Sequence, residues 1–213
     1  MKTNDLITAL AADLDTKPVS VGSALARAIA VSLPVAAAIL IYVLHVRSDF
    51  WTSIGVSPRF TFKFVFTLAT AAAGLWLSLR LSQPGKSAGP ALGGLVLAAA
   101  LLLIAVTAEL IALPQARWAG ALIGDKAVPC MILIPTLAAA PFAAILFAMR
   151  SGAPANPGMA GAAAGLLSGA IGATLYASHC TNDSPLFVAV WYVIALAAIT
   201  LAGSLIGRKV LRW

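Results

Sequence analysis

The sequence predicts an all-α, polytopic membrane protein: a bundle of six transmembrane helices preceded by a short cytoplasmic amphipathic segment. Apolar residues make up 61% of the 213 residues and charged residues only 10%, whereas about 25% of the residues in soluble domains are charged. Six stretches each offer the roughly 20 mostly apolar residues that a membrane span needs. Runs such as 95–106 are apolar throughout, without the alternation that transmembrane β-strands show.

The first element is the N-terminal tail, residues 1–24, which begins with the pattern of a short amphipathic helix. Residues 3–5 are of types that favour helix starts, and four apolar residues follow at helical spacing. Because a helix of about 12 residues is marginal alone, we expect it to be ordered by docking. The side-chain charge of 1–18 is −1, which suits a groove on a cytosolic protein better than anionic lipid; an inert tail is the alternative. The apolar stripe consists of Leu6, Ile7, Leu10 and Leu14.

The six spans make up the rest of the chain, one transmembrane domain over residues 25–213. Each is expected to be a helix, because in lipid only hydrogen bonds within the segment satisfy the backbone. Short connectors make neighbouring helices antiparallel. In span five, glycines recur every three or four residues along one face, which predicts close packing against a neighbouring helix. The spans are expected at 28–46, 61–81, 90–112, 129–149, 158–177 and 187–207.

The positions of Lys and Arg predict the orientation. An even number of spans puts both termini on the same side of the membrane. If that side is the cytoplasm, nine Lys and Arg lie inside and five lie outside, which is the sense that the positive-inside rule favours. The basic residues are dispersed among helix ends, so the net charge of +7 indicates contact with the lipid bilayer rather than direct binding to nucleic acid.

Few ionisable residues fall within the spans, although transporters, pumps and channels usually keep such residues at membrane depth. Lys63 and Glu109 lie within a turn of their predicted outer ends, and Arg27 and Arg80 lie near inner ends. A small transporter or metal permease therefore stays as the alternative function, with little support. No Ser/His/Asp arrangement, phosphate loop or pair of carboxylates suggests an active site, so we expect neither an enzyme nor a cofactor.

The two cysteines flank the hairpin of spans four and five. Cys130 opens span four and Cys180 lies just beyond span five, each 25 residues from Ala155 in the turn. Since helices rise equally per residue, both sulfurs should reach a similar depth at the outer face. Three interpretations stay open: isolated small apolar residues, a structural disulfide in an oxidising periplasm, or a responsive thiol pair. Thiolates and an imidazole suit a soft metal, and the possible ligands are Cys130, Cys180 and the adjacent His179.

Several segments together carry a resemblance to a known family. They are the opening heptad 1–7, Pro129-Cys130, the glycine-rich fifth span, residues 176–192 and the basic end through Trp213. With these segments the chain resembles, over essentially its whole length, the six-span membrane anti-sigma factors of the negative-regulator-of-sigma-F (NrsF) type. The segment that spans the second cysteine is the most specific part of the likeness.

The resemblance implies a protein of the bacterial inner membrane whose cytoplasmic tail sequesters an extracytoplasmic-function (ECF) sigma factor. It implies further that a stress signal, an oxidant or a heavy metal, acts on two outward-facing cysteines, Cys130 and Cys180, and frees the sigma factor. We predict that this change repacks the hairpin of spans four and five and alters how the tail is presented. This chain has Asn4 where the family usually has a second Asp. The sigma-contact residues that the resemblance implies are Asp5, Leu6, Ile7 and Leu10.

Overall fold

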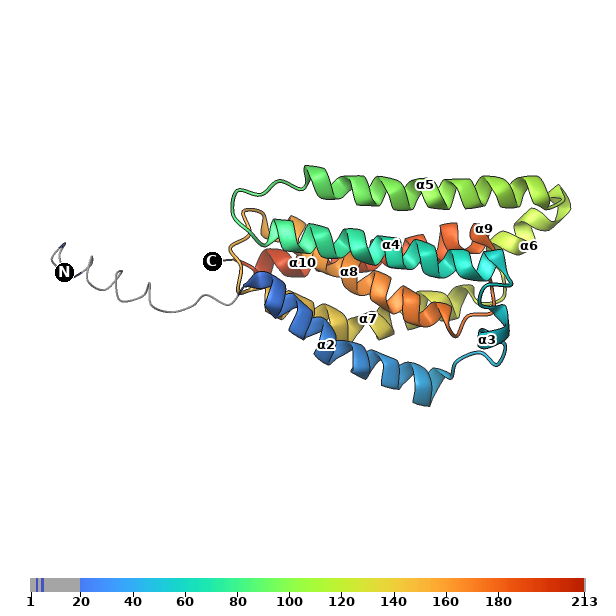
Figure 1. Cartoon of the computed structure of the whole chain (residues 1–213), viewed down its shortest axis with the longest axis horizontal. Coiled ribbons are helices and arrows are strands. Elements are labelled where there is room, and N and C mark those ends of the chain that lie inside the picture. The colour runs from blue at the N-terminus through green and yellow to red at the C-terminus, as the bar shows by residue number, and fades with distance from the viewer. Residues whose placement is uncertain (1–2, 4, 6–19, 213) are drawn as a thin grey trace.

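The computed structural model describes residues 3, 5 and 20–212, and this part of the chain is a bundle of helices that run along one common axis (Figure 1). Six helical stretches are long and apolar enough to cross a membrane. The predicted all-α class and the number of spans are therefore confirmed. In chain order the spans are α2 (Val21–Ile39) with η1 (Leu40–Leu44), α4 (Pro58–Leu81), α5 (Gly89–Ala112), α7 (Ala127–Met149), α8 (Pro157–Ala177), and α9 (Pro185–Phe187) with η3 (Val188–Tyr192) and α10 (Val193–Val210).

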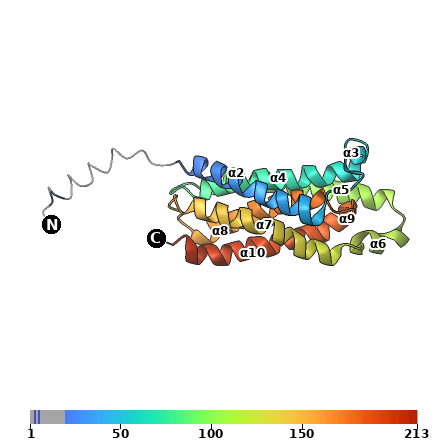
Figure 2. The same ribbon diagram turned by 90° about the horizontal axis from the view of Figure 1, so that it is seen from below.

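Short helices lie in two of the connections. They are α3 (Phe50–Ser53), which precedes α4, and η2 (Gln115–Arg117) with α6 (Trp118–Ile123), which precede α7. In two perpendicular views, α3, α6 and α9 lie at one end of the bundle, whereas α2 begins and α10 ends at the other (Figures 1 and 2). We call the end with α3, α6 and α9 the distal end, and the opposite end the proximal end.

The first span begins earlier than the expected residue 28. The Ser20 side chain accepts a hydrogen bond from the Ser23 N–H at 3.2 Å, so α2 starts at Val21 with a regular N-cap. Arg27, which marks the edge of the apolar run in the sequence, is exposed and donates to the Ser23 carbonyl oxygen at 3.3 Å. Arg27 can therefore be part of the helix and still keep its charge outside the core, because its long side chain reaches away from the apolar surface.

The most buried helix is α8, which packs against α10, α4 and α7. Its glycines allow this closeness, as expected, but they face two different helices. A methyl group at Gly161 would collide with the Gly203 carbonyl oxygen of α10, and one at Gly172 would lie 2.7 Å from the Ile134 carbonyl oxygen of α7. Backbone-to-backbone approach of this kind is how small residues promote helix association in membranes.

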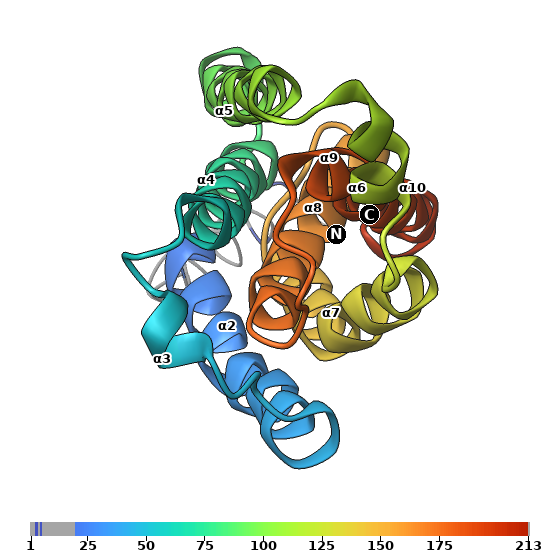
Figure 3. The ribbon, with the colours of Figure 1, turned by 90° about the vertical axis from the view of Figure 1, so that its right-hand side faces the viewer.

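The helices α2 and α5 form the periphery of the bundle, on opposite sides of it when viewed from the distal end (Figure 3). Helix α5 packs chiefly on α4, and α2 packs chiefly on α7. Both carry many exposed apolar side chains, among them Val31 and Ile111. Exposed apolar faces of this kind are what a helix in contact with lipid presents.

Candidate functional site

Both cysteines lie at the distal end, inside one apolar cluster. Cys130 is in the first turn of α7, and Cys180 follows the end of α8. Their side chains are 0% and 1% exposed, and both are free thiols. The cluster also contains Tyr176, Phe187 and Tyr192. Two thiols that are far apart in the sequence therefore share one environment.

Two buried tyrosine hydroxyls lie near the Cys180 thiol. Tyr176 and Tyr192 are fully buried, and their ring centroids are 5.9 Å apart. Each side chain lies close enough to interact with the Cys180 thiol, although neither hydroxyl makes a hydrogen bond of regular geometry to a described residue. The thiol itself makes a long contact, 3.9 Å, with the carbonyl oxygen of Asn182. Buried hydroxyls normally have a partner, and the polar group that both of these hydroxyls approach is the Cys180 thiol.

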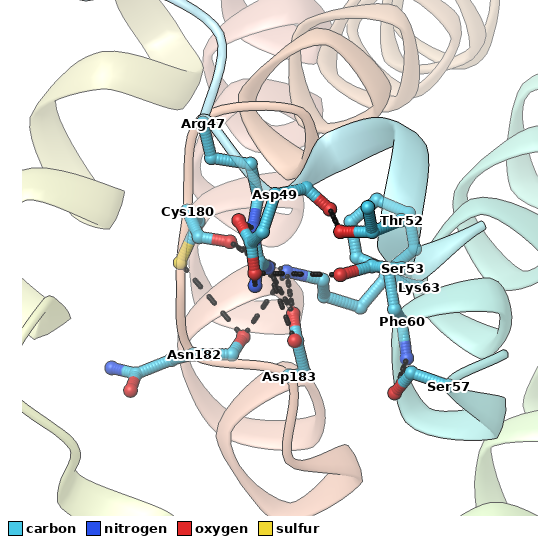
Figure 4. Close-up of polar contacts among 10 residues, drawn as sticks. All are labelled: Arg47, Asp49, Thr52, Ser53, Ser57, Phe60, Lys63, Cys180, Asn182 and Asp183. Carbon is cyan, nitrogen blue, oxygen red and sulfur yellow. Dashed lines mark hydrogen bonds and ion pairs between the residues drawn. The ribbon is translucent and has the colours of Figure 1, made fainter.

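Buried cations hold the segment that carries Cys180 (Figure 4). Lys63 is fully buried, and its Nζ lies 2.6 Å from Asp183 Oδ1. The same ammonium donates to the backbone carbonyl oxygens of Cys180 at 2.9 Å and Asn182 at 3.2 Å. Arg47 Nη1 lies 2.9 Å from Asp183 Oδ1 and donates to the Cys180 carbonyl oxygen at 3.2 Å. Burial of a charge is tolerated when it is paired, and Asp183 is the partner of both cations.

Arg47 binds a second carboxylate as well. Its Nε and Nη2 each donate to one oxygen of Asp49 at 2.6 Å, which is bidentate geometry, and its guanidinium carbon lies 5.1 Å from the ring centroid of Phe60. The hydrogen bond from Arg47 lowers the pKa of the Asp49 carboxyl from 3.8 to about 2. The bonds to Asp49, followed by those to Asp183, raise the pKa of Arg47 above its ordinary value. The guanidinium is therefore a permanent charge at this position.

Backbone contacts also join the end of the first span to the Cys180 segment. The Arg47 N–H donates to the Ser178 carbonyl oxygen at 3.1 Å. His179 Nδ1 lies 2.9 Å from the His45 carbonyl oxygen, a hydrogen bond when Nδ1 carries the proton. His45 follows the π-helix η1 and has a φ of +64°, a conformation that costs a residue other than glycine on the order of 1–3 kcal/mol. Contacts from the Cys180 segment hold His45 in it.

A second buried charge lies on α5 at the distal end. Glu109 is 5% exposed, accepts from Arg59 Nε at 2.8 Å and accepts from the Ser184 hydroxyl at 3.2 Å. Ser184 directly follows Asp183 in the sequence. The connection between α8 and α9 is therefore bound to side chains of α4 and α5 as well as to the end of the first span.

The predicted metal ligands are not assembled into a three-ligand set. In the described part of the chain no group of three or more His, Cys, Asp or Glu side chains lies close enough to hold a metal ion. The Nδ1 atom of His179 faces the His45 carbonyl oxygen instead. The set of Cys130, Cys180 and His179 stays a prediction that this geometry does not support.

The predicted partner-binding residues belong to the N-terminal tail. Leu6, Ile7 and Leu10 lie outside the described residues, whereas Asp5 is described and exposed. The amphipathic helix expected for the tail stays a prediction for the same reason.

Sequence reasoning missed the ion pairs of Asp183 with Lys63 and Arg47. A usable signal was present, because a lysine inside an otherwise apolar span requires a partner. The nearby outer connectors contain few carboxylates, with Asp183 among them. The paired tyrosines had no such signal, because buried aromatic residues are ordinary in a helical core.

Fold and site together define a class: a membrane protein of six helices with a buried thiol pair and an ion-pair network at one end. Residues 10–213 match the family described as negative regulator of sigma F. The chain is 35% identical over 216 aligned positions to the probable anti-sigma-F factor NrsF of Azospira oryzae. It is 36% identical over 220 positions to the anti-sigma-F factor NrsF of Caulobacter vibrioides.

Both alignments cover the whole of each chain. The chain therefore belongs to the NrsF family of negative regulators of sigma F, and the resemblance is confirmed. No solved structure matches it.

Proposed function

We propose that the chain is a membrane-bound anti-sigma factor that sequesters an ECF sigma factor through its N-terminal tail. An oxidant or a heavy metal acts on Cys130 and Cys180 and causes release of the sigma factor. The observation that carries the proposal is the full-length similarity to two anti-sigma-F factors. The burial of both thiols in one cluster supports a joint role for them.

We assign the protein to a bacterial inner membrane with both termini in the cytoplasm. The excess of Lys and Arg on the proposed inner side supports this orientation. The same orientation makes the proximal end cytoplasmic, and it puts both cysteines on the periplasmic side. Alkaline phosphatase fused after residue 213 should be inactive and green fluorescent protein fused there should fluoresce. An active phosphatase fusion would overturn the assignment.

The role of the tail is tested with the full chain co-expressed with an ECF sigma factor from the same genome. Leu6→Asp/Leu10→Asp puts two charges on the apolar stripe, and the sigma factor should no longer co-purify. Thr8→Asp/Ala12→Asp adds the same charge on the opposite side of the expected helix and should leave co-purification intact. Loss with both variants, or with neither, would refute binding through the stripe.

The role of the thiols is tested by replacing Cys130 and Cys180 with Ser. The double variant should still sequester the sigma factor, but oxidant and heavy metal should no longer induce the genes that the sigma factor transcribes. Normal induction in the double variant would refute sensing by the cysteines.

The alternative of a small transporter gains nothing from the structure. Lys63 and Glu109 are the buried charges among the described residues, and both are paired at the distal end rather than placed along a path through the bundle. Both relatives are named as anti-sigma factors, and we propose that this chain likewise acts by binding and has no enzymatic activity.

A further inference from the structure

The segment that carries Cys180 is attached directly to the end of the first span. We define the Cys180 segment as residues 178–183 and the span end as residues 45–47. Four contacts join them. They are Arg47 N to Ser178 O at 3.1 Å, His179 Nδ1 to His45 O at 2.9 Å, Arg47 Nη1 to Cys180 O at 3.2 Å, and Arg47 Nη1 to the Asp183 carboxylate, 2.9 Å from Oδ1 and 3.0 Å from Oδ2.

The span end has an unusual backbone. The last turn of the span, Leu40–Leu44, is a π-helix, a form that is rare and often lies at functional sites. His45 follows with its positive φ. The contacts from Ser178 and His179 are made to the Arg47 N–H and the His45 carbonyl oxygen, two groups that directly follow the strained φ torsion of His45. If the Cys180 segment moves, these contacts break, and His45 is then free to leave its strained backbone conformation.

Apart from this end, the first span is attached mainly to one helix. It packs chiefly on α7 and only weakly on α8, and its fully buried side chains are few, Leu25 and Ala36 among them. Helix α7 carries Cys130. The first span is therefore in contact with both elements that carry a cysteine, along its length with one and at its distal end with the other. Its proximal end begins at Val21 and continues directly from the N-terminal tail.

We propose that the span end is a latch that couples the Cys180 segment to the tail, with Arg47 and His45 as its positioning residues. Cys180 is 1% exposed, so a larger group on its sulfur has no free space and displaces the segment. The four contacts are then lost, the distal end of the first span is released, and the span shifts against α7. This deepens the proposed function, because it names the route by which a change at the thiols reaches the tail. The route runs along the first span rather than through the hairpin of α7 and α8.

The experiment is hydrogen–deuterium exchange of the full chain in detergent micelles, without any sigma factor. Cys180→Leu enlarges the side chain, and Cys180→Ala is the matched control that reduces it. Arg47→Met removes the guanidinium, and Arg117→Met is its control at an exposed arginine of the distal end. Exchange is compared in residues 40–48, in residues 21–30 and in residues 89–100 of α5, the half of that helix that lies away from Glu109 and its bond to Ser184; this half is the α5 reference.

Cys180→Leu and Arg47→Met should each speed exchange in residues 40–48 by about tenfold or more, the effect of losing one or two hydrogen bonds. Exchange in residues 21–30 should rise as well, and α5 should be unchanged. Both control variants should behave as the wild type. If Arg47→Met does not fold, Arg47→Lys keeps the charge and should give the same pattern, because the shorter ammonium cannot span all of its acceptors.

Three results would overturn the latch. They are no change in residues 40–48, a change there that stops short of residues 21–30, and an equal rise in α5, which is the signature of general destabilisation. The sigma-binding experiment with Leu6→Asp/Leu10→Asp fails or succeeds independently, because exchange is measured on the chain alone.

Discussion

Replacing Lys63 tests how much the buried ion-pair network stabilises the fold. Lys63 is fully buried and has three acceptors, Asp183 at 2.6 Å, Cys180 at 2.9 Å and Asn182 at 3.2 Å. Lys63→Met removes these bonds, but Asp183 keeps its ion pair with Arg47. Each hydrogen bond to a charged group contributes about 1.5–3 kcal/mol, and methionine fills much of the lost volume. Methionine also removes the cost of burying an ammonium, which offsets much of the loss of these bonds, so we expect the free energy of unfolding to fall by only about 2–3 kcal/mol.

Asp183→Asn should cost more, about 3–5 kcal/mol, because it leaves a buried ammonium without a carboxylate. Both losses are measured by denaturant unfolding in micelles, followed by tryptophan fluorescence. Asp125→Asn is the matched control, since its pair with Lys126 is exposed and 4.0 Å long, and it should change stability by less than about 0.5 kcal/mol. The reasoning is refuted if Lys63→Met costs as much as Asp183→Asn, or if both cost less than about 1 kcal/mol.

Three further predictions follow from single side chains. Tyr192→Phe removes a buried hydroxyl without a described partner and should leave the thermal midpoint unchanged or raise it, as Tyr42→Phe, at an exposed site, leaves it unchanged. Gly161→Ala forces a methyl group against α10 and should cost about 1–3 kcal/mol, whereas Gly93→Ala, with open space around it, should gain up to about 1 kcal/mol. The hydrogen bond from Arg47 lowers the pKa of Asp49 from 3.8 to about 2. Its contribution to the stability of the fold should be complete above pH 3.8 and should be lost as the pH falls through about 2. The measurement is the difference between the unfolding midpoints of the wild type and Asp49→Asn as a function of pH.

Each of these has an outcome that contradicts it. A clear loss of stability in Tyr192→Phe would mean that the hydroxyl makes a stabilising hydrogen bond, to which the Cys180 thiol is near enough. Equal effects of alanine at Gly161 and Gly93 would mean that α8 and α10 are not in backbone contact. A midpoint difference for Asp49→Asn that stays constant on acidification would mean that the carboxylate is not held by its arginine.

The spans were predictable from the sequence because burial in lipid leaves a one-dimensional signal, a run of about 20 apolar residues. The start of the first span was harder to predict, because Arg27 interrupts the apolar run. The Ser20 cap sets the helix start at Val21, seven residues earlier than expected. Glycine spacing in α8 predicted a close interface but not its partner. Spacing defines a face of one helix, whereas which neighbour occupies that face depends on how the whole bundle closes.

The pairing of Arg47 with Asp183 could not be predicted from the sequence for a related reason, although the buried Lys63 did indicate that a carboxylate partner was needed. Arg47 and Asp183 lie 136 positions apart, and nothing local in either connector indicates the other. Loop residues such as these are brought together only after the helices that carry them have packed. The relative depth of Cys130 and Cys180, in contrast, can be estimated from the sequence alone, because it follows from counting residues along two helices that leave one turn.

The glycine-lined contact between α8 and α10 restricts where motion can occur in this molecule. The backbones are in direct contact at Gly161 and Gly203, so the two helices leave each other little room to shift at this crossing. We therefore expect displacements to be larger in the helices at the rim than in this central pair, and the span that leads to the N-terminus is one of those outer helices (Figure 3).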